Sequence, residues 1–254
     1  MRLFRHLFSL AAFVLAGTAV IAQVTATVSP PVAPVGCEIR ITLANDTNQV
    51  LNSGACPFTV QDANGNSIFS PFVCILIIIP IAPGQTHDFT WNQTDNFGNP
   101  VPPGNYTVTM NLQNGSTVSL PLTIGGVNAG MGTLGVQRPG LARPLYLCAP
   151  NDGNAIYFCA ASVTTVVGVP TCAGVNFPLD IDTLFLYSMS SQGNFVNMIG
   201  VLGPNGTTTN PIVSLPNDPA LSGASYNMAF LTIDFSNPNC PVPSVSPALP
   251  ITIQ

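Results

Sequence analysis

His87 is the one histidine after residue 22 of this sequence, so any Ser–His–Asp or Cys–His catalyst would depend on it. In Gly-Gln-Thr-His-Asp-Phe-Thr-Trp, strand alternation places His87, Phe89 and Trp91 on one face. A Gly-x-Ser-x-Gly nucleophile turn does not occur in the sequence. We therefore expect His87 to be a polar residue at the start of a strand, and the protein not to be an enzyme.

Asp180 and Asp182 are two residues apart in Pro-Leu-Asp-Ile-Asp, so an extended segment would point both carboxylates the same way. Two carboxylates can serve a glycosidase or bind Ca²⁺. The stretch lacks the dense acidic spacing of a calcium loop, and phosphate-binding and dinucleotide motifs are missing. We expect no catalytic pair, no metal site and no cofactor, although calcium at Asp180 and Asp182 stays open.

Seven cysteines fit disulfides in an oxidising compartment, and the odd number leaves one thiol over. Cys56 and Cys74 flank a hairpin, which favours their pairing and leaves Cys37 as the odd thiol. In the second half, a short loop favours Cys159–Cys172 and leaves Cys148–Cys240. Four cysteines allow three connectivities, so the pairing in the second half stays open.

The N-terminus, MRLFRHLFSLAAFVLAGTAVIAQ, has the form of a signal peptide. A basic start precedes an apolar run that is too short to span a bilayer, and small residues suit cleavage after Ala22. Residues 1–22 are therefore predicted to direct export to the periplasm, cell surface or extracellular space. After cleavage the protein is not expected to be an integral membrane protein.

Charge excludes one class of partner. Without Arg2 and Arg5 the chain keeps three arginines, no lysine and ten acidic residues, a formal charge of −7. A nucleic-acid binder neutralises phosphates with Lys and Arg, so that class is excluded. The expected partner is a protein or a surface component that the sequence does not identify.

Short β-rich runs between Gly, Pro and Asn turns predict an all-β protein of two β-sandwich domains in tandem. The domains are predicted at 23–126 and 145–254, joined by a Gly-rich linker without a strand pattern at 127–144. In the second domain, one of the strands is predicted at Leu184–Met189.

The stretch Trp91–Met110 contains the single tryptophan, and it is either core or the lip of a binding site. Tyr106 begins an alternating strand after Pro102-Pro-Gly, so its hydroxyl is expected to bond back to the loop as a tyrosine corner. Trp91 and Tyr106 are predicted to be structural core. A binding role is left only to the loop 92–100.

Two resemblances support this organisation. The order NDTNQVLNSGACPFTVQDANGNSIFSP, then IAPGQTHDFTWNQTDNFGNPVPPGNYTV, resembles the bacterial intracellular proteinase inhibitor (BsuPI-like) family, an Ig-like sandwich, over Glu38–Leu112. FPLDIDTLFLYSM, VLGPNGTTTNPIVSLPNDPALSG, YNMAFLTID and SPALPITIQ resemble a C-terminal β-sandwich module of exported bacterial proteins of unknown role. The resemblances imply two sandwiches and bring no catalytic residues.

The function predicted from the sequence is that of an exported, non-enzymatic structural or protein-interaction module of the cell surface or periplasm. The first alternative is a secreted proteinase inhibitor that acts through the first domain. A carbohydrate-binding module is the weaker alternative, because a buried tryptophan offers no platform for a sugar.

Overall fold

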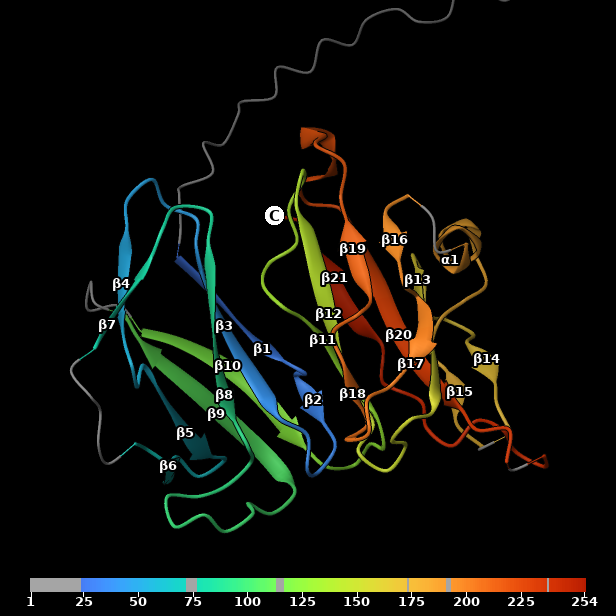
Figure 1. Cartoon of the computed structure of the whole chain (residues 1–254), viewed down its shortest axis with the longest axis horizontal. Helices are drawn as coiled ribbons and strands as arrows, with labels where there is room; N and C mark the ends of the chain where they lie inside the picture. Colours follow the sequence, from blue (N-terminus) through green and yellow to red (C-terminus); the bar gives the residue numbers. More distant parts are fainter. Residues whose placement is uncertain (1–23, 72–76, 113–116, 173, 191–192, 237) are drawn as a thin grey trace, which may run out of the picture.

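The chain folds into two β-sandwiches that lie side by side in the computed structural model (Figure 1). The structure describes residues 24–71, 77–112, 117–172, 174–190, 193–236 and 238–254. The predicted all-β fold class is confirmed. The predicted signal peptide, residues 1–22, lies outside the described residues. Within them, no helix combines the length and apolar character needed to cross a membrane.

The first sandwich packs two sheets around one core. One sheet has the order β1-β3-β8 and the other β2-β10-β9-β5-β6, while β4 pairs with β7 beside them. In β9, Tyr106, Val108 and Met110 are buried and the residues between them are not, as period-2 alternation requires. The strands are β1 (Val24–Ser29), β2 (Val32–Ala33), β3 (Ile39–Asn45), β4 (Leu51–Gly54), β5 (Phe58–Asp62), β6 (Ser67–Phe69), β7 (Ile78–Ile81), β8 (Thr86–Trp91), β9 (Gly104–Asn111) and β10 (Thr117–Ile124).

The second sandwich pairs the order β11-β12-β19-β16, with β18 on β12, against the order β17-β13-β20-β21. A hairpin, β14-β15, and helix α1 cover part of the outer face of β13 and β20. The elements are β11 (Gly130–Thr133), β12 (Ala142–Cys148), β13 (Ile156–Ser162), β14 (Val169–Pro170), β15 (Asn176–Phe177), α1 (Thr183–Met189), β16 (Phe195–Val196), β17 (Ile199–Val201), β18 (Thr207–Thr208), β19 (Ile212–Ser214), a 3₁₀ turn (Pro219–Leu221), β20 (Ser225–Ile233) and β21 (Leu249–Thr252).

The predicted strand Leu184–Met189 is wrong, because this segment is helix α1. Asp182 caps the helix N-terminus, and its carboxylate accepts the backbone N–H of Phe185 at 2.8 Å. Phe185 and Ser188, three residues apart, are buried on one face. A short apolar run does not distinguish a strand from a helix by its pattern alone.

The Gly-rich segment 127–144 is not the strandless linker that the sequence predicts. It contains β11, which pairs with β12 and lies beside β1 and β2 of the first sandwich (Figure 1). A side chain on Gly132 would come within 2.8 Å of the Ser29 Cα, and one on Gly130 within 2.6 Å of the Val32 oxygen. Glycine here permits close approach of two backbones.

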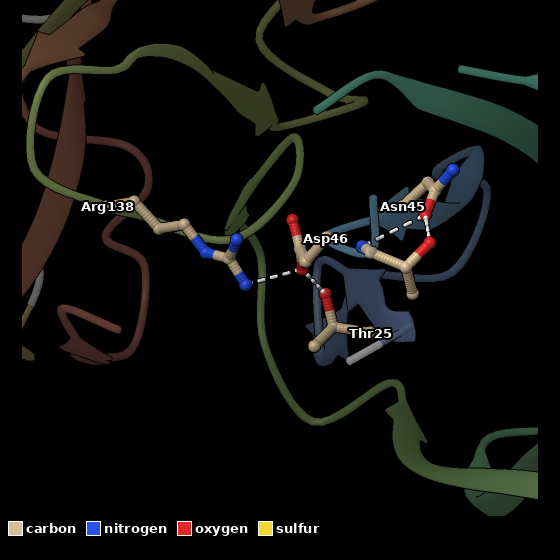
Figure 2. A network of polar contacts seen from close by, with 5 residues as sticks. Thr25, Asn45, Asp46 and Arg138 are labelled. Carbon is tan, nitrogen blue, oxygen red and sulfur yellow. Dashed lines mark hydrogen bonds and ion pairs between the residues drawn. The ribbon is translucent and has the colours of Figure 1, made fainter. Parts of the chain in front are cut away.

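The two sandwiches meet where β11 lies beside β1 and β2, and this contact region is called the joint below. A polar network also connects the two sandwiches at the joint (Figure 2). The guanidinium of Arg138 lies 2.5 Å from the carboxylate of Asp46, which also accepts the Thr25 hydroxyl at 2.9 Å. The Asp46 side chain is only 6% exposed, so this ion pair is largely withdrawn from water. At the other end of β3, the Arg40 guanidinium lies 5.1 Å from the centroid of the Tyr146 ring, which belongs to the second sandwich.

The disulfides differ from the predicted pairs. Cys37 is not the odd thiol: it bonds Cys148 across the joint, with Cα atoms 6.1 Å apart. Cys172 bonds Cys240, so the predicted Cys159–Cys172 and Cys148–Cys240 pairs are wrong.

Cys159 is the free cysteine among the residues that the structure describes. It faces the core from β13 and is fully buried there, which keeps it away from Cys172 on the opposite side of that sheet. Cys74 lies outside the described residues, so the Cys56–Cys74 pair stays a prediction.

Candidate functional site

His87 and the carboxylates singled out by the sequence are all engaged in structural contacts. The His87 ring packs against Phe89, with ring centroids 4.7 Å apart. Along β8, Phe89 and Trp91 are buried while Asp88 and Thr90 are exposed. Among the described residues, no group of three or more His, Cys, Asp or Glu side chains is placed to hold a metal ion.

The Asp180 carboxylate accepts hydrogen bonds from backbone and hydroxyl donors in the segment 164–168. Its carboxylate accepts the Thr164 hydroxyl at 2.6 Å and the N–H groups of Val166, Val167 and Gly168 at 2.8 to 2.9 Å. The Thr164 hydroxyl first, and then these N–H groups, lower the pKa of Asp180 below its ordinary value.

The Asp182 carboxylate also accepts hydrogen bonds, from residues 162–163 and from the start of α1. Its Oδ2 accepts the Ser162 hydroxyl and the N–H of Val163, while its Oδ1 caps α1. The lone pairs that Ca²⁺ would need are thus directed at neutral donors within the chain. Both aspartates brace loops around α1.

Trp91 and Tyr106 lie in the core of the first sandwich, 2% and 6% exposed, with ring centroids 6.2 Å apart. The Tyr106 hydroxyl donates to the Pro102 oxygen at 2.5 Å, which is the bond expected of a tyrosine corner. The Trp91 indole N–H donates to the Thr94 oxygen at 2.8 Å. Both aromatic residues therefore support the base of the loop 92–100.

The loop 92–100 displays one large apolar residue on a rigid turn. Phe97 is 83% exposed at its tip. The Asp95 carboxylate accepts the N–H groups of Phe97 and Asn99 at 2.8 and 2.9 Å, and the backbone N–H of Gly98 donates to the Asp95 oxygen. Gly98 has a φ of +83°, which only glycine adopts freely.

The base of this loop is held by Gln93, which the sequence did not single out. Gln93 has a φ of +56°, is 3% exposed, and hydrogen-bonds the Gly36 N–H at 3.0 Å and the Pro34 oxygen at 2.8 Å. A non-glycine residue with positive φ persists where surrounding contacts over-determine it, which is common at functional sites. A second Asp-x-x-Gly-Asn turn, at 62–66, repeats the Asp95 hydrogen bonds. The repeated Asp-x-x-Gly-Asn pattern is therefore the sequence feature that could have predicted two rigid turns.

The comparisons with known proteins begin with a family model. Residues 21–123 match the Countin C-terminal domain, a β-rich domain that covers the first sandwich. This is a different family from the BsuPI-like one that the motifs resemble, and the β-sandwich is compatible with both. No curated protein matches the chain.

Several solved structures are similar to parts of the chain. A β-glucosidase from Listeria innocua in complex with glucose is 15% identical over 41% of this chain and 16% of its own, with a TM-score of 0.26. Red sea bream transglutaminase is 6% identical over 92% of this chain and 31% of its own, with a TM-score of 0.30. A tetra-tandem repeat from the extending region of a large adhesion protein is 15% identical over 92% and 50%, with a TM-score of 0.25. The chain thus spans half or less of the length of each.

Proposed function

We propose that the protein is an exported, non-enzymatic interaction module of the cell surface or periplasm, and that it contacts its partner through the loop 92–100. The observation that carries the proposal is the 83% exposure of Phe97 on a turn braced by Asp95 and Gln93. A preorganised loop loses little conformational entropy on binding, and a large aromatic residue is a common energetic anchor at interfaces.

Export rests on the predicted signal peptide and on the disulfides. Cys37–Cys148 and Cys172–Cys240 are consistent with folding in an oxidising compartment. The non-enzymatic role rests on the aspartates and His87, whose contacts are structural. A carbohydrate-binding role is disfavoured, since Trp91 is buried and offers no aromatic platform.

Proteinase inhibition through the first sandwich is the second candidate. Its support is the same loop, which presents an exposed aromatic side chain on a fixed backbone, together with the resemblance of Glu38–Leu112 to the BsuPI-like family. A protease with an apolar specificity pocket is the class of target that Phe97 would suit.

Photo-crosslinking from position 97 in expressing cells tests the interaction module. A photoreactive amino acid at position 97 is expected to give a discrete protein adduct in the envelope or secreted fraction. The same amino acid at Val50, which is 58% exposed elsewhere on the first sandwich, is the matched control and should give none. Equal labelling from both positions, or none from position 97, would reject the loop as the contact site.

A protease panel separates the two candidates. Full-length mature protein and its Phe97→Ala variant are titrated against serine and cysteine proteases with apolar specificity. Stoichiometric inhibition that Phe97→Ala abolishes would establish the inhibitor. Full protease activity at excess protein, with the crosslink retained, would establish the module without inhibition.

A further inference from the structure

The outer face of the second sandwich carries an open apolar pocket of about 500 Å³ next to α1. Its floor consists of Phe158, Phe177 and Phe185, whose ring centroids are 6.3 Å from one another. Thr171 is its one side chain with a hydroxyl, and the other lining residues are apolar or belong to a disulfide. The pocket lies in the opposite sandwich from the loop 92–100.

The pocket exists because β13 and β20 are apolar on both faces. On β13, Tyr157, Cys159 and Ala161 face the sandwich interior, whereas Phe158 and Ala160 face outward. Helix α1 and the hairpin β14-β15 cover this outward face in part. The disulfide Cys172–Cys240 joins the two segments that form one wall, 170–172 and 241–242. The Cys172–Cys240 bond therefore holds these two segments of the pocket wall together.

Exposed apolar side chains belong to the pocket lining and to the chain segment that leads into it at Val169. Ile181 and Met189, which line the pocket, are 63% and 38% exposed. Val166 and Val167 are 86% and 76% exposed on the loop that Asp180 holds in place. Apolar groups clustered around a concave site mark a binding surface.

The charge around the pocket is of one sign. Residues 144–254 contain five aspartates and no Lys, Arg or His. Asp180 and Asp182 flank Ile181, and the backbone N–H of Asp234 donates to the oxygen of Pro241 in the pocket wall. Hydrogen bonds from Ser236 lower the pKa of Asp234, and those to Asp180 act likewise, so both carboxylates are ionised at neutral pH.

We propose that this pocket docks a partner-protein segment in which one large apolar side chain is flanked by lysine or arginine. The apolar cavity supplies the anchor site, and the surrounding aspartates supply the charge complementarity. A fatty acid or an anionic lipid would bring a second negative charge to this surface. A second copy of the chain is a poor fit, because it has three arginines and no lysine after residue 22. Arg138 and Arg40 pair with Asp46 and Glu38, and burial lowers the pKa of Arg143, which is partly withdrawn from water.

Calorimetric titration of the full mature protein with synthetic peptides tests the proposal. The probe is a short peptide with phenylalanine between lysine pairs, and its controls replace phenylalanine by alanine or every lysine by glutamate. The lysine–phenylalanine peptide is expected to bind with one-to-one stoichiometry and to weaken at high salt. The two control peptides are expected not to bind.

Two variants locate the binding. Ile181→Ser removes an exposed lining residue, so it is expected to keep the fold, which circular dichroism checks, and to weaken binding about tenfold. Val50→Ser removes a comparably exposed residue from the first sandwich and should leave affinity unchanged. Absence of binding by the lysine–phenylalanine peptide, equal binding by the glutamate peptide, or equal affinity of Ile181→Ser would overturn the proposal. Self-association that Ile181→Ser abolishes would instead assign the pocket to a second copy.

Discussion

Asp180 illustrates how one carboxylate can hold a loop through hydrogen bonds. Its two oxygens accept four hydrogen bonds from residues 164–168. Because these bonds favour the charged form, the pKa of Asp180 is lower in the folded protein than its ordinary value of 3.8. Folding is therefore stabilised above about pH 4 by this group, and that stabilisation is lost as the pH falls below it.

We predict that Asp180→Asn lowers the urea midpoint at pH 7, where the native carboxylate is charged. The difference from the native protein should shrink at pH 3, where the unfolded chain binds a proton at Asp180 and the contribution of the carboxylate falls. Urea unfolding of both proteins at pH 7 and pH 3 measures this difference in midpoint. An equal difference at both would mean that the hydrogen bonds do not favour the charged carboxylate.

The burial of Cys159 makes its thiol unreactive in the folded protein. It is fully buried, and burial raises the pKa of its thiol because the thiolate is not solvated there. We predict that a maleimide reagent labels Cys159 slowly in the native protein and rapidly in urea. Peptide mapping after labelling should find the label on residue 159 and not on Cys37. Label on Cys37 would contradict the Cys37–Cys148 bond.

At the scale of elements, the loop 92–100 depends on Gln93. Gln93→Ala and Gln93→Gly both remove the hydrogen bonds to Pro34 and Gly36, but only glycine adopts the positive φ without strain. We predict that Gln93→Ala destabilises the protein by about 1 kcal/mol more than Gln93→Gly. Amide exchange in residues 95–99 should accelerate in both variants. Unchanged exchange would show that the Asp95 turn holds the loop by itself.

Local sequence patterns were sufficient to predict some of these elements and not others. Period-2 alternation predicted β8 and β9 and their buried faces, because the direction of a strand side chain depends only on its place in the strand. Alternation could not predict α1, whose start depends on the capping carboxylate of Asp182. The loop 92–100 was predicted as a turn, but the side chain of Gln93 finds its partners 57 and 59 residues away.

At the scale of the whole molecule, the joint makes the two sandwiches one unit. The Cys37–Cys148 bond closes a loop with a sequence separation of 111, and for loops of this size the unfolded-state constraint is worth about 5 kcal/mol. We predict that replacing both cysteines by alanine separates urea unfolding into two transitions. Replacing Cys172 and Cys240 by alanine is the matched control, which lowers stability without separating the sandwiches. A single unshifted transition in the Cys37 and Cys148 variant would contradict a mechanical role for that bond.

The sequence by itself determined the all-β class, the turns and the alternation of buried and exposed residues, because these follow from backbone geometry and neighbouring side chains. Only the tertiary structure decided which cysteines pair, since a disulfide needs Cα atoms about 6 Å apart and the chain brings distant segments together. It also gave Gly130 and Gly132 their role, as places where two backbones touch and not as a flexible linker. The pocket beside α1 likewise arises only when β13, α1 and the Cys172–Cys240 bond meet, because no local pattern records contacts between segments so far apart in the chain.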